Sequence, residues 1–179
     1  MTEACLGLGT NLGDREAQLC NALAALNATP GIRILAVSRV FRTAPWGGIA
    51  QPDFLNLCVR IETPLAPLDL LAACKAVEQH AGRQPRERWG PREIDIDILL
   101  MDGAEMTTPE LTLPHPRLTE RRFVLEPLAD IAPDWVTGGQ TVSAHAAALR
   151  TADPAQACVA QEIAFDGLIQ ALNPSRNRP

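Results

Sequence analysis

Residues 54–62 have the sequence FLNLCVRIE, with an aliphatic side chain at every second position. Successive side chains of a β-strand point to opposite faces, so this alternation predicts a strand with one face in a core. The other face is then available for chemistry. The core face takes Leu55, Leu57, Val59 and Ile61, and the opposite face takes Phe54, Asn56, Cys58 and Arg60.

Segments before and after this strand have the patterns of further strands and helices. Residues 4–8 form an apolar strand that leads through a turn at 11–14 into a helix, and residues 32–43 are rich in β-formers. Pro67 suits the first turn of a second helix, and Gly82 ends it. The apolar stripes of the two helices are Leu19, Leu23 and Leu26, followed by Leu70, Cys74, Val77 and Ala81.

The second half of the chain continues this mixture of strands and helices. Residues 94–101 predict a strand in the centre of the sheet, and Asp102-Gly103 predicts a hairpin turn into an extended segment at 105–108. The further expected elements are short helices between 115 and 132 with a break at Pro127, a helix capped by Ser143, another helix from Asp153 toward Leu172, and a disordered end from Asn173.

Strands separated by helices, together with hairpins, predict an α+β fold. We expect a ferredoxin-like layered α/β/α sandwich with a mixed, mostly antiparallel sheet. Residues 1–150 would form one domain, and residues 151–179 a helical or extended tail that packs on it.

The composition limits the compartment and the partners. The chain has 179 residues, a net charge of -5 and no apolar run near the ~20 residues of a membrane span. We therefore expect a cytoplasmic protein that binds small molecules but neither nucleic acid nor membrane. We also expect a monomer, although the sequence itself carries no sign of the oligomeric state. Five widely spaced cysteines within apolar segments predict buried, reduced thiols.

Asp95 and Asp97 form a D-x-D pair within the strand at 94–101. Residues two apart in a strand point the same way, so both carboxylates emerge on one face and repel unless cations lie between them. Such a pair of hard oxygen ligands suits Mg²⁺, and two metal ions could clamp a transferring phosphoryl group. The alternative is the exposed polar face of an amphipathic strand.

An arginine-rich segment precedes the carboxylate pair. Arg83, Arg86, Arg88 and Arg92 stand among proline and glycine, a composition typical of a mobile loop. Guanidinium groups beside a metal-binding pair are suited to a polyphosphate, although a solvated loop would have the same composition. Together the two motifs favour phosphate chemistry.

Other side chains are candidates for binding a flat ring and a phosphate. Phe54 and Asn56 share a strand face and could stack on and hydrogen-bond a heteroaromatic ring, with Phe123 as a second plate. Taken alone, a phenylalanine in either setting is more often a core residue. His115, between two prolines, could donate to a phosphate, and the glycines of GLGTNLG, residues 7–13, permit close backbone approach without matching a nucleotide-binding loop.

Four stretches resemble the 6-hydroxymethyl-7,8-dihydropterin pyrophosphokinase family. They are GLGTNLGD, RTAPWG with QPDFLN, GRQPRERWGPREIDIDILL, and LTLPHPRLTERRFVLEPLADIAPD, in family order across residues 6–134. The resemblance implies transfer of diphosphate from ATP, the co-substrate, to the hydroxymethyl group of the pterin in folate biosynthesis.

The resemblance also implies roles for individual residues. Two Mg²⁺ ions would be held by Asp95 and Asp97, with Arg83 and Arg92 stabilising the migrating diphosphate. The ATP site would comprise Glu78, Arg88, Trp89, Arg92, Ile98, Thr112, His115 and Arg121. The pterin site would comprise Gly9, Thr43, Ala44, Pro45, Trp46, Phe54, Asn56, Asp95 and Phe123.

This sequence departs from the family pattern at several positions. Phe54 stands where tyrosine is common, and Lys75, Glu110 and Pro116 replace other residues expected beside ATP. Two alternatives stay open at this point. One is another Mg-dependent phosphoryl or nucleotidyl transferase, or a phosphatase, and the other is a nucleotide-binding ferredoxin-like regulatory module without turnover.

Overall fold

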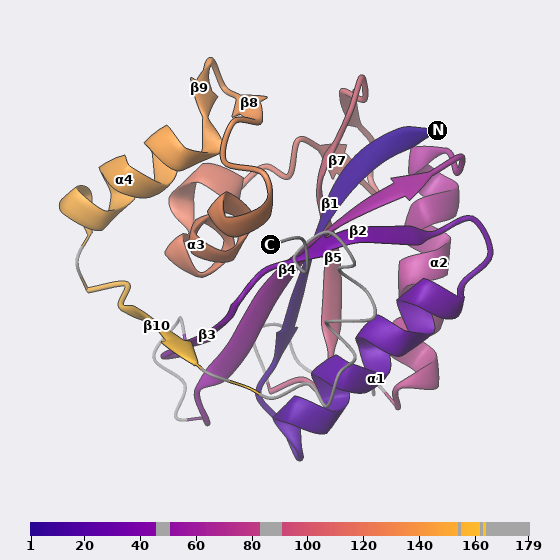
Figure 1. Ribbon diagram of the computed structural model, residues 1–179, viewed down its shortest axis with the longest axis horizontal. Coiled ribbons are helices and arrows are strands. Elements are labelled where there is room, and N and C mark those ends of the chain that lie inside the picture. The colour runs from indigo at the N-terminus through magenta and orange to yellow at the C-terminus, as the bar shows by residue number, and fades with distance from the viewer. Residues whose placement is uncertain (46–50, 83–90, 154, 162, 164–179) are drawn as a thin grey trace, which may run out of the picture.

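A computed structural model describes residues 1–45, 51–82, 91–153, 155–161 and 163. Its centre is a six-stranded sheet, which Figure 1 shows running through the middle of the molecule. The strands lie in the order β10 (Cys158–Gln161), β3 (Val40–Thr43), β4 (Phe54–Thr63), β1 (Thr2–Thr10) and β5 (Asp95–Met101), with β2 (Arg33–Val37) also paired to β4.

Strand β4 organises the sheet because it is long enough to pair with three strands. Along one edge β3 pairs with its first half and β2 with its second half, while β1 follows its whole length on the other edge. Every strand pair among the described residues is antiparallel. The predicted α+β sandwich is confirmed, with a sheet more uniform than the mixed one expected.

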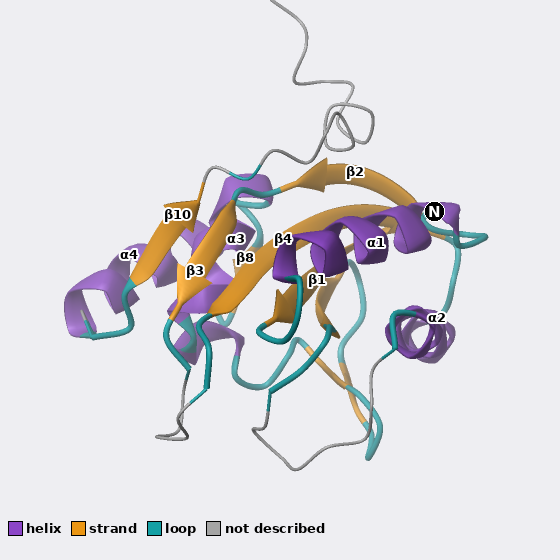
Figure 2. Ribbon diagram, turned by 90° about the horizontal axis from the view of Figure 1, so that it is seen from below, coloured by secondary structure: helices purple, strands orange, loops and turns teal. Residues whose placement is uncertain are grey.

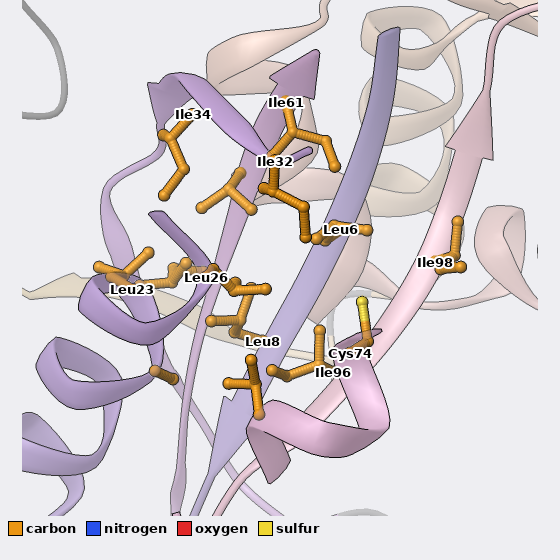
Figure 3. Close-up of a cluster of buried hydrophobic side chains, with 14 of the residues drawn as sticks. Leu6, Leu8, Leu23, Leu26, Ile32, Ile34, Ile61, Cys74, Ile96 and Ile98 are labelled. Carbon is orange, nitrogen blue, oxygen red and sulfur yellow. The ribbon is translucent and has the colours of Figure 1, made fainter. Parts of the chain in front are cut away.

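Two helices cover one face of the sheet, α1 (Arg15–Ala28) and α2 (Pro67–His80). Helix α1 begins at Asp14, whose side chain accepts a hydrogen bond from the amide of Ala17, as an N-cap residue does. The predicted apolar stripes of both helices lie in the core beneath them (Figure 3). This core also contains Leu6, Leu8, Leu55, Leu57, Val59, Ile61, Ile94, Ile96 and Ile98.

Helix α3 (Arg122–Ile131) lies on the other face, and α4 (Val142–Ala152) packs against it (Figures 1 and 2). Burial of Cys58, Leu99 and Leu125 joins this layer to the sheet. Short elements complete the described part of the chain: β6 (Met106–Thr107) pairs with β7 (Thr112–Leu113), β8 (Val136–Thr137) pairs with β9 (Gln140–Thr141), and a 3₁₀ turn spans Leu118–Glu120.

Strand β5 is not central as predicted but ends the strand order, and within the described residues it pairs with β1 alone. Its apolar side chains are nevertheless buried in two clusters, since Ile96 and Ile98 belong to the core beneath α1 and α2, and Leu99 and Leu100 to the cluster that contains residues of α3. The amide of His115 donates to the carbonyl of Leu99, so the segment after β7 also covers part of its outer edge. The turn at Gly103 exists, with a positive φ of 68°, but the strand after it, β6, pairs with β7 rather than with β5.

Three helix predictions are also corrected. Pro127 lies inside α3 without interrupting it, since packing of Leu125 and Leu128 against the sheet compensates for the missing amide donor. Helix α4 is capped by Thr141, not Ser143. The helix expected after Asp153 is replaced at Cys158–Gln161 by β10, and the end from Asn173, predicted to be disordered, lies outside the described residues.

All five cysteines are free; Cys5, Cys58 and Cys74 are buried as predicted, whereas Cys20 and Cys158 are half-buried. No helix in the described ranges is long and apolar enough to cross a membrane.

Candidate active site

A cavity of about 120 Å³ opens where β1, β3, β4, β5 and the start of α3 meet. The predicted pterin and phosphate residues gather there from segments far apart in the sequence. Those that line the cavity are Gly9, Thr43, Ala44, Phe54, Asn56, Arg92, Asp95, Asp97, Arg121 and Phe123.

Strand β1 forms the floor of the cavity with two glycines. Gly9 lies opposite Asn56 on one side and Asp95 on the other, so β1 separates the strand of the ring-binding candidates from that of the carboxylates. A Cβ atom at Gly9 would lie 2.9 Å from Oδ1 of Asn56, and one at Gly7 would lie 3.3 Å from Cδ1 of Leu99. The glycines are therefore needed for close packing, as the sequence predicted.

The side chain of Asn56 is buried and oriented by one hydrogen bond. Its Nδ2 donates to Oγ1 of Thr43 at 2.8 Å. This bond turns the Nδ2 amino group toward Thr43 and leaves Oδ1 as the acceptor beside Gly9. The site can thus accept a hydrogen bond from an amino or ring N–H group.

Two phenyl rings line the same cavity from different layers. Phe54 begins β4, and Phe123 lies in the first turn of α3. The guanidinium group of Arg121 lies 5.6 Å from the centroid of the Phe123 ring, within cation–π range. The Phe123 ring and the Arg121 cation therefore lie side by side at the N-terminus of α3.

The carboxylates of Asp95 and Asp97 both line the cavity, as strand periodicity predicts. Burial and the neighbouring Asp95 raise the pKa of Asp97, although Lys75, Arg121 and Arg92 act in the opposite direction. Arg92 donates from Nη1 to Oδ2 of Asp95. Two crowded carboxylates resist carrying two negative charges without a cation between them.

The oxygen donors of this pair fit Mg²⁺, which is commonly held by one or two carboxylates plus substrate phosphates. No cluster of three or more His, Cys, Asp or Glu side chains suitable for a metal is present among the residues that the structure describes. Any ion bound here would therefore need oxygen ligands from a substrate or water in addition to Asp95 and Asp97.

Glu78 fixes the strand that carries the carboxylates. Its side chain is 2% exposed and accepts a hydrogen bond from the amide of Ile96 at 2.7 Å. Lys75 donates to both of its carboxylate oxygens, at 2.9 and 3.1 Å. Because Ile96 lies between Asp95 and Asp97, Glu78 anchors the backbone that sets their position.

His115 lies outside the cavity, beside the outer edge of β5. Burial and the charges of Arg121 and Arg117 lower the pKa of His115 to about 4. Its Nδ1 accepts from the amide of Arg117 at 3.2 Å, which places the proton of the neutral ring on Nε2. The ring is therefore a neutral donor near pH 7.

Asn11 is a residue that sequence reasoning placed only in a turn. Its side chain is 1% exposed, donates to Oε1 of Gln51 and the carbonyl of Pro52, and accepts from the amide of Arg92. Its own amide donates to the Arg92 carbonyl. One buried amide thus links the chain at Gln51 to the chain at Arg92, and both of these residues line the cavity.

The remaining candidates divide into three groups. Pro45 lines a neighbouring cavity instead of the first one. Neither Ile98 nor Thr112 lines the first cavity. Ile98 is buried in the core, and Thr112 lies in β7. Trp46, Arg83, Arg88 and Trp89 lie outside the described residues.

Missed by sequence reasoning are Gln51, which lines the cavity, and Asn11. The motifs QPDFLN and GLGTNLG contain these two residues and were the available signal.

Comparisons with known proteins identify relatives over most of the chain. The family described as 7,8-dihydro-6-hydroxymethylpterin-pyrophosphokinase matches residues 5–133. A 2-amino-4-hydroxy-6-hydroxymethyldihydropteridine pyrophosphokinase of Methylorubrum extorquens is 53% identical over 142 residues, which cover 79% of this chain and 90% of the relative. The enzyme of the same name from Bacillus subtilis is 44% identical over 128 residues, covering 72% and 77%.

Solved structures with the same fold include Plasmodium falciparum HPPK-DHPS. The wild-type protein with STZ-DHP superposes with a TM-score of 0.67 at 17% identity, over 87% of this chain and 44% of that chain. A structure of HPPK-DHPS in complex with substrates gives 0.65 at 15% identity, over 86% and 44%. This chain thus spans less than half the length of those solved chains, and the likeness concerns the fold.

Proposed function

Because the chain belongs to the 7,8-dihydro-6-hydroxymethylpterin-pyrophosphokinase family, a family of folate biosynthesis, we propose that it transfers the β,γ-diphosphate of ATP to 6-hydroxymethyl-7,8-dihydropterin. The chain is a pyrophosphokinase, as its motifs predicted. The products would be AMP and the pterin diphosphate.

The arrangement around Gly9 supports this proposal. Asn56 lies on one side of β1 and Asp95 on the other, within one cavity. A ring held near Asn56 and Phe54 would have its hydroxymethyl group within reach of the carboxylates. A ring site joined in this way to a phosphate site is what transfer between the two substrates requires.

On the pterin side, the chain would bind and orient a flat ring. Phe54 and Phe123 would stack on it, and Oδ1 of Asn56 would accept from its amino group. Thr43 keeps the amide in this orientation and thereby selects a donor on the ring.

On the ATP side, the chain supplies fixed hydrogen-bond donors. Arg92 and Arg121 line the cavity, and their guanidinium groups would bind oxygens of the migrating diphosphate. Nε2 of the neutral His115 would donate to a phosphate oxygen. These preorganised donors would stabilise charge that spreads over the phosphoryl oxygens in the transition state.

Asp95 and Asp97 would hold Mg²⁺, two ions by the family resemblance, whose positive charge would polarise the phosphoryl oxygens when bound. The raised pKa of Asp97 supports this assignment, since a nearby cation would favour the ionised form. Glu78 keeps the two carboxylates in place through Ile96.

In the reaction, the hydroxymethyl oxygen would form a bond to the β-phosphorus as the bond from that phosphorus to the α,β-bridging oxygen breaks. AMP departs with the bridging oxygen, and the hydroxyl proton is released. Alignment of the two substrates by the ring site and the arginines would account for much of the rate, because positioning replaces an improbable encounter.

The test is AMP formation from ATP, measured with and without the pterin, and with and without Mg²⁺. The proposal expects AMP only when the pterin and the metal are both present. Release of phosphate or diphosphate in place of AMP would indicate a different phosphoryl or nucleotidyl transferase. Nucleotide binding without any turnover would indicate a binding module.

A further inference from the structure

The C-terminal segment, outside the family match at residues 5–133, returns to the site. Strand β10 pairs with β3 so that Cys158 lies opposite Thr43. Thr43 holds the side chain of Asn56. The tail therefore supports the outer edge of the strand that orients the ring-binding amide.

Gln156 joins this segment to the start of α3. Its Oε1 accepts from the amide of Arg122 at 3.0 Å, and its Nε2 donates to the carbonyl of Glu120 at 3.2 Å and to Oδ2 of Asp153 at 2.9 Å. The N-cap residue of α3, Arg121, makes no side-chain capping bond, so Gln156 supplies an acceptor that this helix end needs.

The bonds of Gln156 lie on either side of a site residue. Glu120 and Arg122 are the chain neighbours of Arg121, and Phe123 is the residue after Arg122. Holding the backbone at both neighbours restricts where the guanidinium group of Arg121 and the ring of Phe123 can lie.

A second cavity, of about 130 Å³, lies between the tail and the first cavity. The two cavities share Thr43, Ala44 and Phe123 as lining residues. The far wall of the second cavity is formed by residues 155–158. Phe123 is thus bordered by the first cavity and by a space that the tail encloses.

We propose that residues 155–158 are the outer wall of the pterin site, and that Gln156 is a positioning residue that holds Phe123 and Arg121 in place for the ring. This inference rests on the proposed pterin site. It predicts that loss of the Gln156 bonds weakens pterin binding most, because Phe123 would contact the ring directly, and weakens ATP binding less, through Arg121 alone.

The experiment compares Gln156→Ala with wild-type protein and with Gln161→Ala. Gln161 is a matched control because it is a glutamine of the same segment whose side chain donates to the carbonyls of Val159 and Ala160, away from α3. For each protein, KM for both substrates and kcat are measured, together with the pterin Kd by fluorescence titration and the thermal unfolding midpoint.

Gln156→Ala should raise the pterin KM and Kd roughly tenfold, the scale of one or two lost hydrogen bonds. The ATP KM should rise less, by about two- to threefold, because Arg121 is only one of the proposed phosphate contacts, and Gln161→Ala should match the wild type. Gln156→Glu keeps the acceptor for Arg122 and should recover part of the pterin affinity. If Gln156→Ala does not fold, Gln156→Met removes the same bonds at similar volume and replaces it in the test.

Unchanged pterin KM and Kd in a folded Gln156 variant would overturn the inference. So would an equal loss for both substrates, which would indicate a general structural role. A wild-type protein that binds pterin but forms no AMP would refute the proposed reaction instead, and the pterin Kd of the variants would still decide the role of Gln156.

Discussion

Replacing Glu78 should disturb β5, the strand that carries Asp95 and Asp97. Glu78→Ala removes the acceptor of the buried Ile96 amide, while Lys75, whose side chain is 42% exposed, can return to water. The unpaired amide should cost about 1–3 kcal/mol of unfolding free energy, and the lost ion pair at most about 1 kcal/mol more. We therefore expect a destabilisation of about 2–3 kcal/mol.

Glu78→Gln is the matched variant, because its carbonyl oxygen can still accept from Ile96. A hydrogen bond to a neutral acceptor is weaker than one to a carboxylate, so this variant should lose about 1 kcal/mol. The assay is urea unfolding of the three proteins, with kcat measured in parallel. Turnover should fall in the order wild type, Gln, Ala, since the spacing of Asp95 and Asp97 depends on this anchor.

Two results would refute the reasoning about Glu78. One is a Glu78→Ala protein within about 0.5 kcal/mol of the wild type, the ordinary range for surface substitutions away from special features. The other is equal damage by alanine and glutamine, which would make the negative charge, rather than the bond to Ile96, the important property.

Three further predictions concern the cavity and its surroundings. Gly9→Ala should displace Oδ1 of Asn56, cost about 1 kcal/mol of stability through the lost bond to Thr43, and raise KM for pterin more than KM for ATP; equal KM changes would contradict this. Because the pKa of His115 falls to about 4 on folding, the unfolded chain binds more protons between about pH 6.5 and 4, so His115 lowers stability as pH falls through that window. His115→Gln should flatten the decline in unfolding free energy between about pH 7 and pH 5, and an unchanged slope would count against it. Arg92→Ala should lower kcat far more than it raises either KM. If the variant raised KM and left kcat unchanged, Arg92 would make no interaction that strengthens in the transition state.

Strand faces could be predicted from the sequence because they depend on local alternation. Asp95 and Asp97 share one face of β5, and Phe54 and Asn56 share one face of β4, where the period of two placed them. The start of α1 directly after the predicted turn at 11–14 was also local. These features need only the order of side chains along one segment.

Features that depend on distant partners were missed or wrongly assigned. The pairing of β10 with β3 joins residues more than a hundred positions apart, and its four residues have no distinctive pattern. The sequence instead predicted a helix that begins at Asp153. Likewise, Asn11 looked like a turn residue because its partners, Gln51 and Arg92, approach it only in the folded chain.

The support that Glu78 gives to β5 could not be inferred from the sequence. The resemblance implied a nucleotide contact for this residue, which stays a prediction. The bond that Glu78 accepts from the Ile96 amide joins α2 to β5 and depends on how these two elements pack.

The most direct test of the central claim follows the β-phosphorus of ATP. ATP labelled at that position is incubated with Mg²⁺, 6-hydroxymethyl-7,8-dihydropterin and the protein, and the products are separated by chromatography. Diphosphate transfer predicts that the label enters the pterin product in step with AMP formation. Label in free phosphate or free diphosphate, with an unlabelled pterin, would contradict it.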